Sequence, residues 1–181
     1  MVAAAILPTC IRQGKVYCLF GKECVYETSA PGYSDFGGGL EKGERILDTA
    51  AREGCEELSG FLGTTKEIRR HLSGSPLCIS VADYHTFIYP IPYDPQLEFY
   101  YNNHQKLIHA KLSKKTIVDS RIFEKQSIKW VCIDDLISFK SQVRPFYKTN
   151  LDVLFAHRDQ IKQYTKIRLR KRNSKTKRNF T

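Results

Sequence analysis

Three glutamates in one short segment, Glu53, Glu56 and Glu57, could hold a divalent cation. If residues 46–58 form a helix, these side chains stand at positions i, i+3 and i+4 and share one face. Exposed like charges at this spacing destabilise a helix by about 0.2–0.5 kcal/mol per pair, so a helix that needed only to be solvated would scatter them. Carboxylate oxygens are the hard ligands that Mg²⁺ and Mn²⁺ prefer. The spacing therefore predicts a metal site, and the alternative is an acidic, solvated helix face.

The three glutamates end a longer pattern of glycine, acids and one arginine. A glycine is followed after five residues by Glu, after seven more by Arg-Glu, and after another two by Glu-Glu. The positions, in order, are Gly38, Glu44, Arg52, Glu53, Glu56 and Glu57. In residue type and spacing they resemble the signature of the Nudix hydrolases, and a looser similarity extends over the flanking segments to about residue 139.

Three positions depart from that signature. Gly54 replaces an aliphatic residue, Ser59 replaces a glycine, and Gly60 takes the final aliphatic place. Gly54 is expected to weaken the helix by about 1 kcal/mol relative to alanine. If the helix runs one residue longer than the signature requires, Gly60 becomes its left-handed cap. The departures concern packing and capping and leave the carboxylates in place.

The resemblance implies a reaction and a cofactor. Nudix enzymes hydrolyse a diphosphate linked to another moiety, and the barrier is electrostatic because water must attack a phosphorus surrounded by negative oxygens. The resemblance implies that Glu53, Glu56 and Glu57 bind Mg²⁺ or Mn²⁺, with the carbonyl of Gly38 completing the shell. Such a cation neutralises phosphate oxygens and acidifies a bound water.

Arg52 and Glu44 are expected to support this site. We expect Arg52 to point to a different face from Glu56 and to pair with Glu44, which would pin the preceding loop to the helix. The alternative is an ordinary surface arginine.

The general base is expected outside the helix. The resemblance implies a carboxylate on a separate loop just before a late strand, and Glu124, six residues before Trp130, has that place. It could equally be a solvated loop acid. Since some family members use a glutamate of the helix instead, Glu53 and Glu57 are the alternative catalytic bases.

Substrate recognition must come from residues outside the signature. Phe99, Tyr100 and Tyr101 could stack on a nucleobase, which is worth about 1–3 kcal/mol per base. They could also be core residues. Three cations, Lys114, Lys115 and Arg121, could contact phosphates, although exposed basic side chains are commonly only solvated.

The positive charge lies mainly at the C-terminal end. The net charge is +10, and residues 166–181 contribute +8 of it without a single acid. We therefore expect a Nudix hydrolase domain over residues 1–165 and a basic, disordered tail over residues 166–181. Such a tail is a solvated end, a nuclear address, or a polyanion-binding segment for RNA, DNA or phosphoinositides.

Composition also bounds the compartment. The chain has no run of eighteen apolar residues, so a membrane span is not expected. The six cysteines include no Cys-x-x-Cys pair, which argues against zinc and favours reduced thiols in the cytoplasm or nucleus. The sequence leaves the oligomeric state open.

The elements that must position the site follow from periodicity and turn residues. We expect strands at residues 2–7, 15–20, 77–90 and 129–133, a loop at 21–36, and helices at 46–58, 96–112, 136–139 and 146–164. Asp134 and Asp135 are placed to cap the third helix. The order of the elements indicates an α/β (α+β) domain, and the resemblance implies an α/β/α sandwich with a central mixed sheet.

Two functions from different classes remain. The first is a metal-dependent pyrophosphohydrolase acting on a nucleoside diphosphate linked to another group, with the basic end of the chain favouring the 5′ cap of messenger RNA (decapping). Free nucleotides, dinucleotides and diphosphoinositol polyphosphates are alternative substrates. The second is a non-catalytic module that binds RNA or another polyanion, and the crowded carboxylates argue against it.

Overall fold

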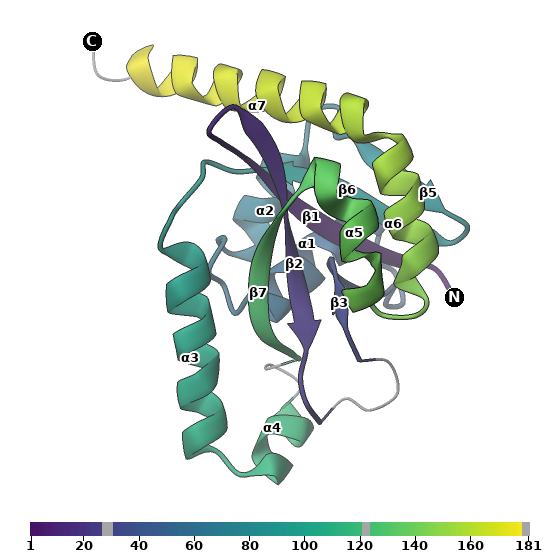
Figure 1. Cartoon of the computed structure of the whole chain (residues 1–181), viewed down its shortest axis with the longest axis vertical. Helices are drawn as coiled ribbons and strands as arrows, with labels where there is room; N and C mark the ends of the chain where they lie inside the picture. Colours follow the sequence, from purple (N-terminus) through teal and green to yellow (C-terminus); the bar gives the residue numbers. More distant parts are fainter. Residues whose placement is uncertain (27–30, 121–123, 179–181) are drawn as a thin grey trace.

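The computed structural model describes residues 1–26, 31–120 and 124–178, with the side chains of residues 120 and 173–178 excepted (Figure 1). Its strands are β1 (Ala3–Arg12), β2 (Lys15–Glu23), β3 (Tyr33–Ser34), β4 (Phe36–Gly39), β5 (Cys78–Val81), β6 (Tyr84–Pro90) and β7 (Lys125–Cys132). Its helices are α1 (Ile46–Glu57), α2 (Thr65–Leu72), α3 (Leu97–Lys111), α4 (Lys114–Ser120), α5 (Leu136–Phe139), α6 (Tyr147–Ala156) and α7 (Arg158–Arg178), with 3₁₀ turns η1 (Ile133–Asp135) and η2 (Lys140–Gln142).

The strands form one mixed sheet. Its order is β3-β2-β1-β6-β5, with β4 paired to β1 and β7 paired to β2. β1 runs parallel to β6 and antiparallel to β2 and β4. The first half of β1 pairs with β4, so Ala4 lies opposite Gly38, and the second half pairs with β2. The predicted α/β fold with a central mixed sheet is confirmed.

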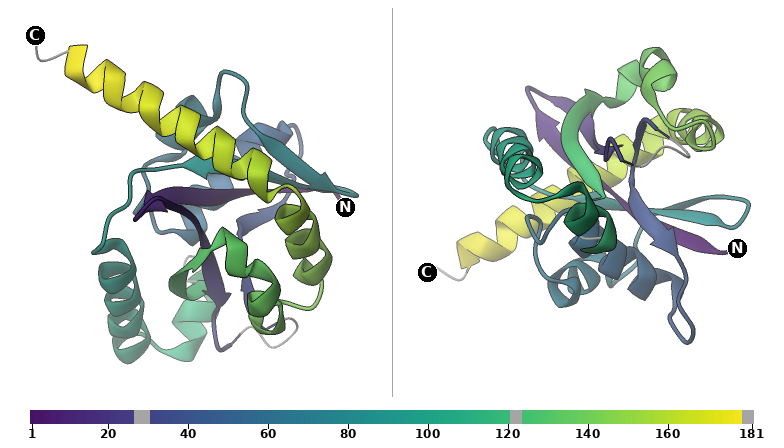
Figure 2. Two further views of the ribbon diagram at one scale, coloured as in Figure 1. Left: turned by 45° about the horizontal axis from the view of Figure 1, so that its top comes forward. Right: turned by 90° about the horizontal axis from the view of Figure 1, so that it is seen from below.

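Helices cover both faces of the sheet because strand residues alternate between two hydrophobic clusters. Ile6 packs in the cluster that includes residues of α1, α2 and α3, whereas its neighbour Leu7 packs in the cluster that includes α5 and α6. Trp130 and Val131 divide between the clusters in the same way. Figure 2 shows α1 and α2 on one side of the sheet and α5 and α6 on the other, which is the predicted sandwich.

Several predicted boundaries need correction. Residues 77–90 form a hairpin rather than one strand, because Ala82, with φ of 48°, starts a turn between β5 and β6. The late strand begins at Lys125 rather than at residue 129, and the predicted loop at 21–36 contains the end of β2 and all of β3. The glycine run at 37–39 lies within β4 rather than opening a loop. The helices predicted at 46–58 and 96–112 are confirmed as α1 and α3.

The C-terminal part differs most from the prediction. The helix expected at 146–164 is broken at His157 into α6 and α7. As far as Arg178, the prediction of a disordered tail from residue 166 is wrong, because α7 continues through this segment. Thr165 is buried and its Oγ1 lies 2.9 Å from Oγ1 of Thr9, so the helix is anchored on β1. Lys, Arg and Gln are good helix formers, which allows a polar helix to continue from that anchor.

Candidate active site

The carboxylates are carried by α1, and Gly54 lets this helix lie close to the sheet. A Cβ atom on Gly54 would stand 2.4 Å from Cδ1 and 2.6 Å from Cγ1 of Ile6 on β1. The residue that departs from the signature therefore has a packing role. Its helix propensity is poor, but the close approach buries Ala50 and Ala51 of α1 completely.

Gly54→Ala should destabilise the protein by about 1–3 kcal/mol, because overpacking outweighs the gain in helix propensity. Urea unfolding measures the change. In an Ile6→Ala background both atoms that the new methyl group meets are absent, so the same substitution should become neutral or stabilising. An equal penalty in both backgrounds would show that the contact with Ile6 is not the cause.

The end of α1 corrects the predicted cap. The N–H of Ser59 donates to the carbonyl of Glu56 at 2.9 Å, and the N–H of Gly60 donates to the carbonyl of Cys55 at 2.9 Å. This pair of bonds is a Schellman motif, whose left-handed position is Ser59, with φ of 51°. The left-handed cap predicted at Gly60 is therefore one residue too late, although Gly60 also has a positive φ of 72°. Ser59 takes the conformation that the signature assigns to glycine.

Arg52 joins the helix to the loop before it. Its Nε donates to Oε1 of Glu44 at 2.8 Å and its Nη2 to Oε2 of Glu44 at 3.0 Å, which is the predicted pairing. The Nη2 also donates to the carbonyl of Gly39 at 3.2 Å. The prediction that Arg52 points away from Glu56 is wrong, because its Nη1 lies 3.2 Å from Oε2 of Glu56 and 2.8 Å from Oε1 of Glu53. At spacing i, i+4 the long arginine side chain reaches this neighbour.

The Glu44 pair should be visible in acid unfolding. The hydrogen bonds from Arg52 lower the pKa of Glu44 from 4.5 to about 2. A depressed carboxyl pKa contributes stability that is present above pH 4.5 and is lost as the pH falls towards 2. Glu44→Gln should therefore cost about 1–3 kcal/mol near neutral pH and progressively less below pH 4.5, as measured by urea unfolding across pH. A penalty that does not depend on pH would contradict the assignment.

The three glutamates of α1 lie in different environments. Glu56 is half-exposed, whereas the side chain of Glu53 is 14% exposed and that of Glu57 is 5% exposed. Gly38 faces Glu53 so closely that a Cβ there would meet Oε1 at 2.5 Å, which explains why the position needs glycine. Burial raises the pKa of Glu53 and raises that of Glu57 further, and the charge of Glu124 adds to both shifts. We call Glu53, Glu56 and Glu57 the carboxylate cluster.

A buried lysine that the sequence analysis missed holds Glu57. The side chain of Lys125 is 1% exposed, and its Nζ lies 3.2 Å from Oε1 of Glu57 and donates to Glu23 and to Oγ of Ser34. Glu23 also accepts from Nη1 of Arg144 at 2.6 Å. Neighbouring Glu57 and Glu23 raise the pKa of Lys125 against the opposing effect of burial, so it stays charged. The other oxygen of Glu57, Oε2, accepts from the N–H of Gly37 at 2.8 Å.

Glu124, the expected base, is exposed and immediately precedes β7. Its backbone carbonyl accepts from the N–H of Cys24 at 2.7 Å, which ties this turn to the end of β2. Its charge acts on both Glu53 and Glu57, so the fold brings residues separated by more than sixty positions to one site.

The cluster fits a hard divalent cation in charge and donor type. Together with Glu23, Glu44 and Glu124, the three carboxylates of the cluster outnumber the cations around them, which are Arg52, Lys125 and Arg144. Among the described residues, no three His, Cys, Asp or Glu side chains are grouped as a ready metal site. In this arrangement Arg52 engages Glu53 and Glu56, while Lys125 engages Glu57. A bound cation would compete with these two side chains for the same oxygens.

The aromatic residues proposed for substrate stacking separate into two groups. Tyr101 is fully buried, and its hydroxyl donates to the carbonyl of Glu57 at 2.7 Å, so the prediction that it stacks on a base is wrong. Phe99 and Tyr100 are 64% and 54% exposed on α3, where they remain available to a ligand.

The cations proposed for phosphate contact are engaged within the protein or lie outside the described part. Lys114 lies 5.2 Å above the ring of Tyr26. Lys115 forms an ion pair with Asp119 one helical turn away. Arg121 lies outside the described residues.

The chain has the fold of the Nudix hydrolases. A MutT/Nudix protein from Listeria innocua matches with a TM-score of 0.54 over 88% of this chain and 94% of that one, at 13% identity. RenU, a Nudix hydrolase from M. smegmatis, matches with a TM-score of 0.52 over 89% and 88%, at 11% identity. A MutT protein from Methanosarcina mazei Go1 gives 0.51 over 87% and 94%, at 13% identity.

These likenesses establish the fold, and the function must be argued from the site. No family model matches the sequence, and no curated protein matches it either. Within the described ranges, no helix is long and apolar enough to cross a membrane.

Proposed function

We propose that this protein is a divalent-metal-dependent pyrophosphohydrolase that cleaves a nucleoside diphosphate linked to another moiety. The observation that supports it most directly is the carboxylate cluster on α1, which Arg52 and Glu44 hold beside Gly38 in a Nudix fold. A helix that served packing alone would gain nothing from crowding three carboxylates, two of them with raised pKa values.

Each residue of the cluster has a role in this proposal. Glu53, Glu56, Glu57 and the carbonyl of Gly38 would hold Mg²⁺ or Mn²⁺, which when bound neutralises phosphate oxygens and acidifies a water. Glu124 is the proposed general base, because its exposed carboxylate can accept a proton from the attacking water. Glu53 and Glu57 are the alternative bases.

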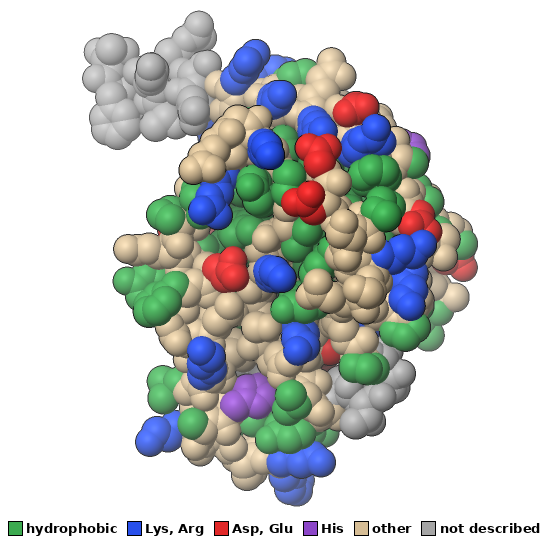
Figure 3. Space-filling model, viewed as in Figure 1, with side chains coloured by type: hydrophobic (Ala, Val, Ile, Leu, Met, Phe, Trp, Pro, Cys, Tyr) green, Lys and Arg blue, Asp and Glu red, His purple; other side chains and the backbone are tan. Residues whose placement is uncertain are grey.

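The proposed substrate is the 5′ cap of messenger RNA. Its support is the positive charge of residues 166–172, which lies along α7, where Lys and Arg side chains follow the upper edge of the molecule (Figure 3). Exposed Phe99 and Tyr100 offer stacking surfaces for a base.

A hydrolysis screen with Mg²⁺ and with Mn²⁺ tests the proposal. Capped RNA, nucleoside triphosphates, dinucleoside polyphosphates and diphosphoinositol polyphosphates are compared, with Glu56→Gln as the inactive control. Release of a nucleoside diphosphate from capped RNA at the highest rate is expected. Faster hydrolysis of a small polyphosphate would replace the proposed substrate. Absence of hydrolysis with every substrate would favour the non-catalytic polyanion-binding module.

A further inference from the structure

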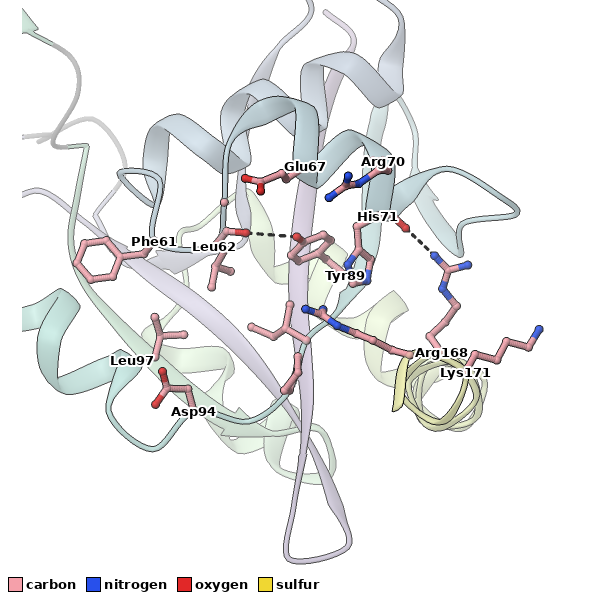
Figure 4. A pocket seen from close by; sticks show the side chains of 14 residues that line it. Phe61, Leu62, Glu67, Arg70, His71, Tyr89, Asp94, Leu97, Arg168 and Lys171 are labelled. Carbon is pink, nitrogen blue, oxygen red and sulfur yellow. Dashed lines mark hydrogen bonds between the residues drawn. The ribbon is translucent and has the colours of Figure 1, made fainter. Parts of the chain in front are cut away.

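A groove that contains none of the carboxylate cluster lies between α2, α7 and the segment after β6. Its volume is about 1180 Å³. Its apolar wall includes Phe61, Leu62, Ile91 and Leu97, and its basic residues are Arg70, Arg168, Lys171 and Arg172. We call it the α2–α7 groove (Figure 4).

The two sides of the groove differ in charge. Figure 4 shows Arg70, Arg168 and Lys171 toward one side and Phe61, Leu97 and Asp94 toward the other. Arg70 and Lys171 are exposed, so both are accessible to a ligand.

Arg168 has mainly a structural task on the basic side. Its two terminal nitrogens donate to the carbonyls of His71, at 2.6 Å, and Gly74, at 3.1 Å, which fixes α7 against the end of α2. Burial, with the charges of Arg172 and Arg168, lowers the pKa of His71 to about 4. The positive charge of this side therefore comes from Arg and Lys side chains and does not depend on His71 above that pH.

We propose that the α2–α7 groove binds a single-stranded segment of RNA, with phosphates along the basic side and bases against the apolar and acidic side. The inference rests on the proposed function in one respect, since it assumes that RNA is the substrate. The RNA would be the chain that follows the 5′ cap, while the diphosphate lies at the carboxylate cluster.

The asymmetry of the groove favours a nucleic acid strand over a compact polyphosphate. An inositol polyphosphate has anionic groups all round and would leave the apolar wall uncovered, and it would meet Glu67 and Asp94 as well as the cations. A single strand has phosphates along one side and flat aromatic bases along the other. Carboxylates such as that of Asp94 can accept from the amino groups of bases, as Asp and Glu do from cytosine.

The groove also lies within reach of the carboxylate cluster. Tyr89, which lines the groove, pairs with Pro8 of β1, and Gly38 pairs with Ala4 of the same strand. Four residues along a strand cover about 13 Å.

A second connection runs through Phe61 at the groove, whose ring centroid lies 5.3 Å from that of Tyr101. The hydroxyl of Tyr101 donates to the carbonyl of Glu57. A few nucleotides can span this separation.

Binding of a labelled single-stranded RNA of about 12 nucleotides, measured with EDTA present so that no hydrolysis is needed, tests the groove. Arg70→Gln/Lys171→Gln should weaken binding and reduce the slope of log affinity against log salt by about 1.4, or about 0.7 per phosphate contact. The matched control, Lys106→Gln/Lys148→Gln, removes the same charge from exposed positions on α3 and α6 and should change the slope far less.

Phe61→Ala tests the apolar side separately. Loss of one stacked base should weaken RNA binding about fivefold or more without changing the salt slope.

Equal salt slopes for the two charge variants would overturn the groove as the phosphate path. Inositol hexakisphosphate could instead displace the RNA equally well from the wild type and from Phe61→Ala, with neither protein preferring RNA. This result would assign the site to a compact polyphosphate and would also overturn the proposal. Because RNA binding is measured without metal, these binding results can be interpreted even if the protein hydrolyses none of the substrates in the screen.

Discussion

Glu56→Gln should reduce the rate of metal-dependent hydrolysis by about 10²–10³-fold while leaving the melting temperature nearly unchanged. The side chain of Glu56 is 52% exposed and its Oε2 lies 3.2 Å from Nη1 of Arg52, so glutamine preserves its shape at little structural cost. The substitution removes a negative ligand that would hold the cation where charge develops in the transition state. Turnover at limiting Mg²⁺, together with thermal unfolding, measures both parts of the expectation.

Glu41→Gln is the matched control for this experiment. Glu41 is also exposed and lies in the loop before α1, and the change in net charge is the same. It should retain near-normal turnover. Comparable rates for Glu56→Gln and Glu41→Gln at limiting Mg²⁺ would remove Glu56 from the metal site.

The sequence was sufficient to place the carboxylates and their support, because these depend on short spacings within one helix and the loop before it. Glu53, Glu56 and Glu57 share a face through helical periodicity alone. The Glu44–Arg52 pair spans eight residues, so local geometry nearly determines it. The order of strands and helices predicted the α/β class, whereas the central mixed sheet was implied by the resemblance to the Nudix hydrolases.

Features formed by distant segments could not be predicted in this way. Lys125 forms an ion pair with Glu23, which is 102 residues away in the sequence. Nothing in the sequence around Lys125 distinguishes it from a surface lysine. Tyr101 is an aromatic residue like its exposed neighbours Phe99 and Tyr100. Because it lies one position further along the helix, its side chain faces the core. The basic end of the chain was expected to be disordered because its composition is polar, whereas Thr165 and Arg168 anchor it to β1 and α2.

Lys125→Met should destabilise the protein by about 3–5 kcal/mol, which is the usual effect of removing one partner from a buried ion pair. In the wild type, two carboxylates, Glu23 and Glu57, face two cations, Lys125 and Arg144. Methionine fills much of the space of the lysine stem but leaves one buried negative charge uncompensated. Because Lys125 also opposes the effect of burial on Glu57, the pKa of Glu57 should rise further in the variant. Urea unfolding measures the loss of stability.

A second substitution separates charge from packing. Of these four charges, Lys125→Met/Glu23→Gln keeps one carboxylate, Glu57, and one cation, Arg144, so the charge is balanced again and much of the lost stability should return. If the double variant is no more stable than Lys125→Met, the lysine stem packed against Gly21, rather than its charge, accounts for the loss. Recovery would instead establish that Lys125 is present to balance Glu23 and Glu57. Lys125 would then hold the buried Glu57, whose Oε2 accepts from the N–H of Gly37 at 2.8 Å, in the position that the proposed metal site requires.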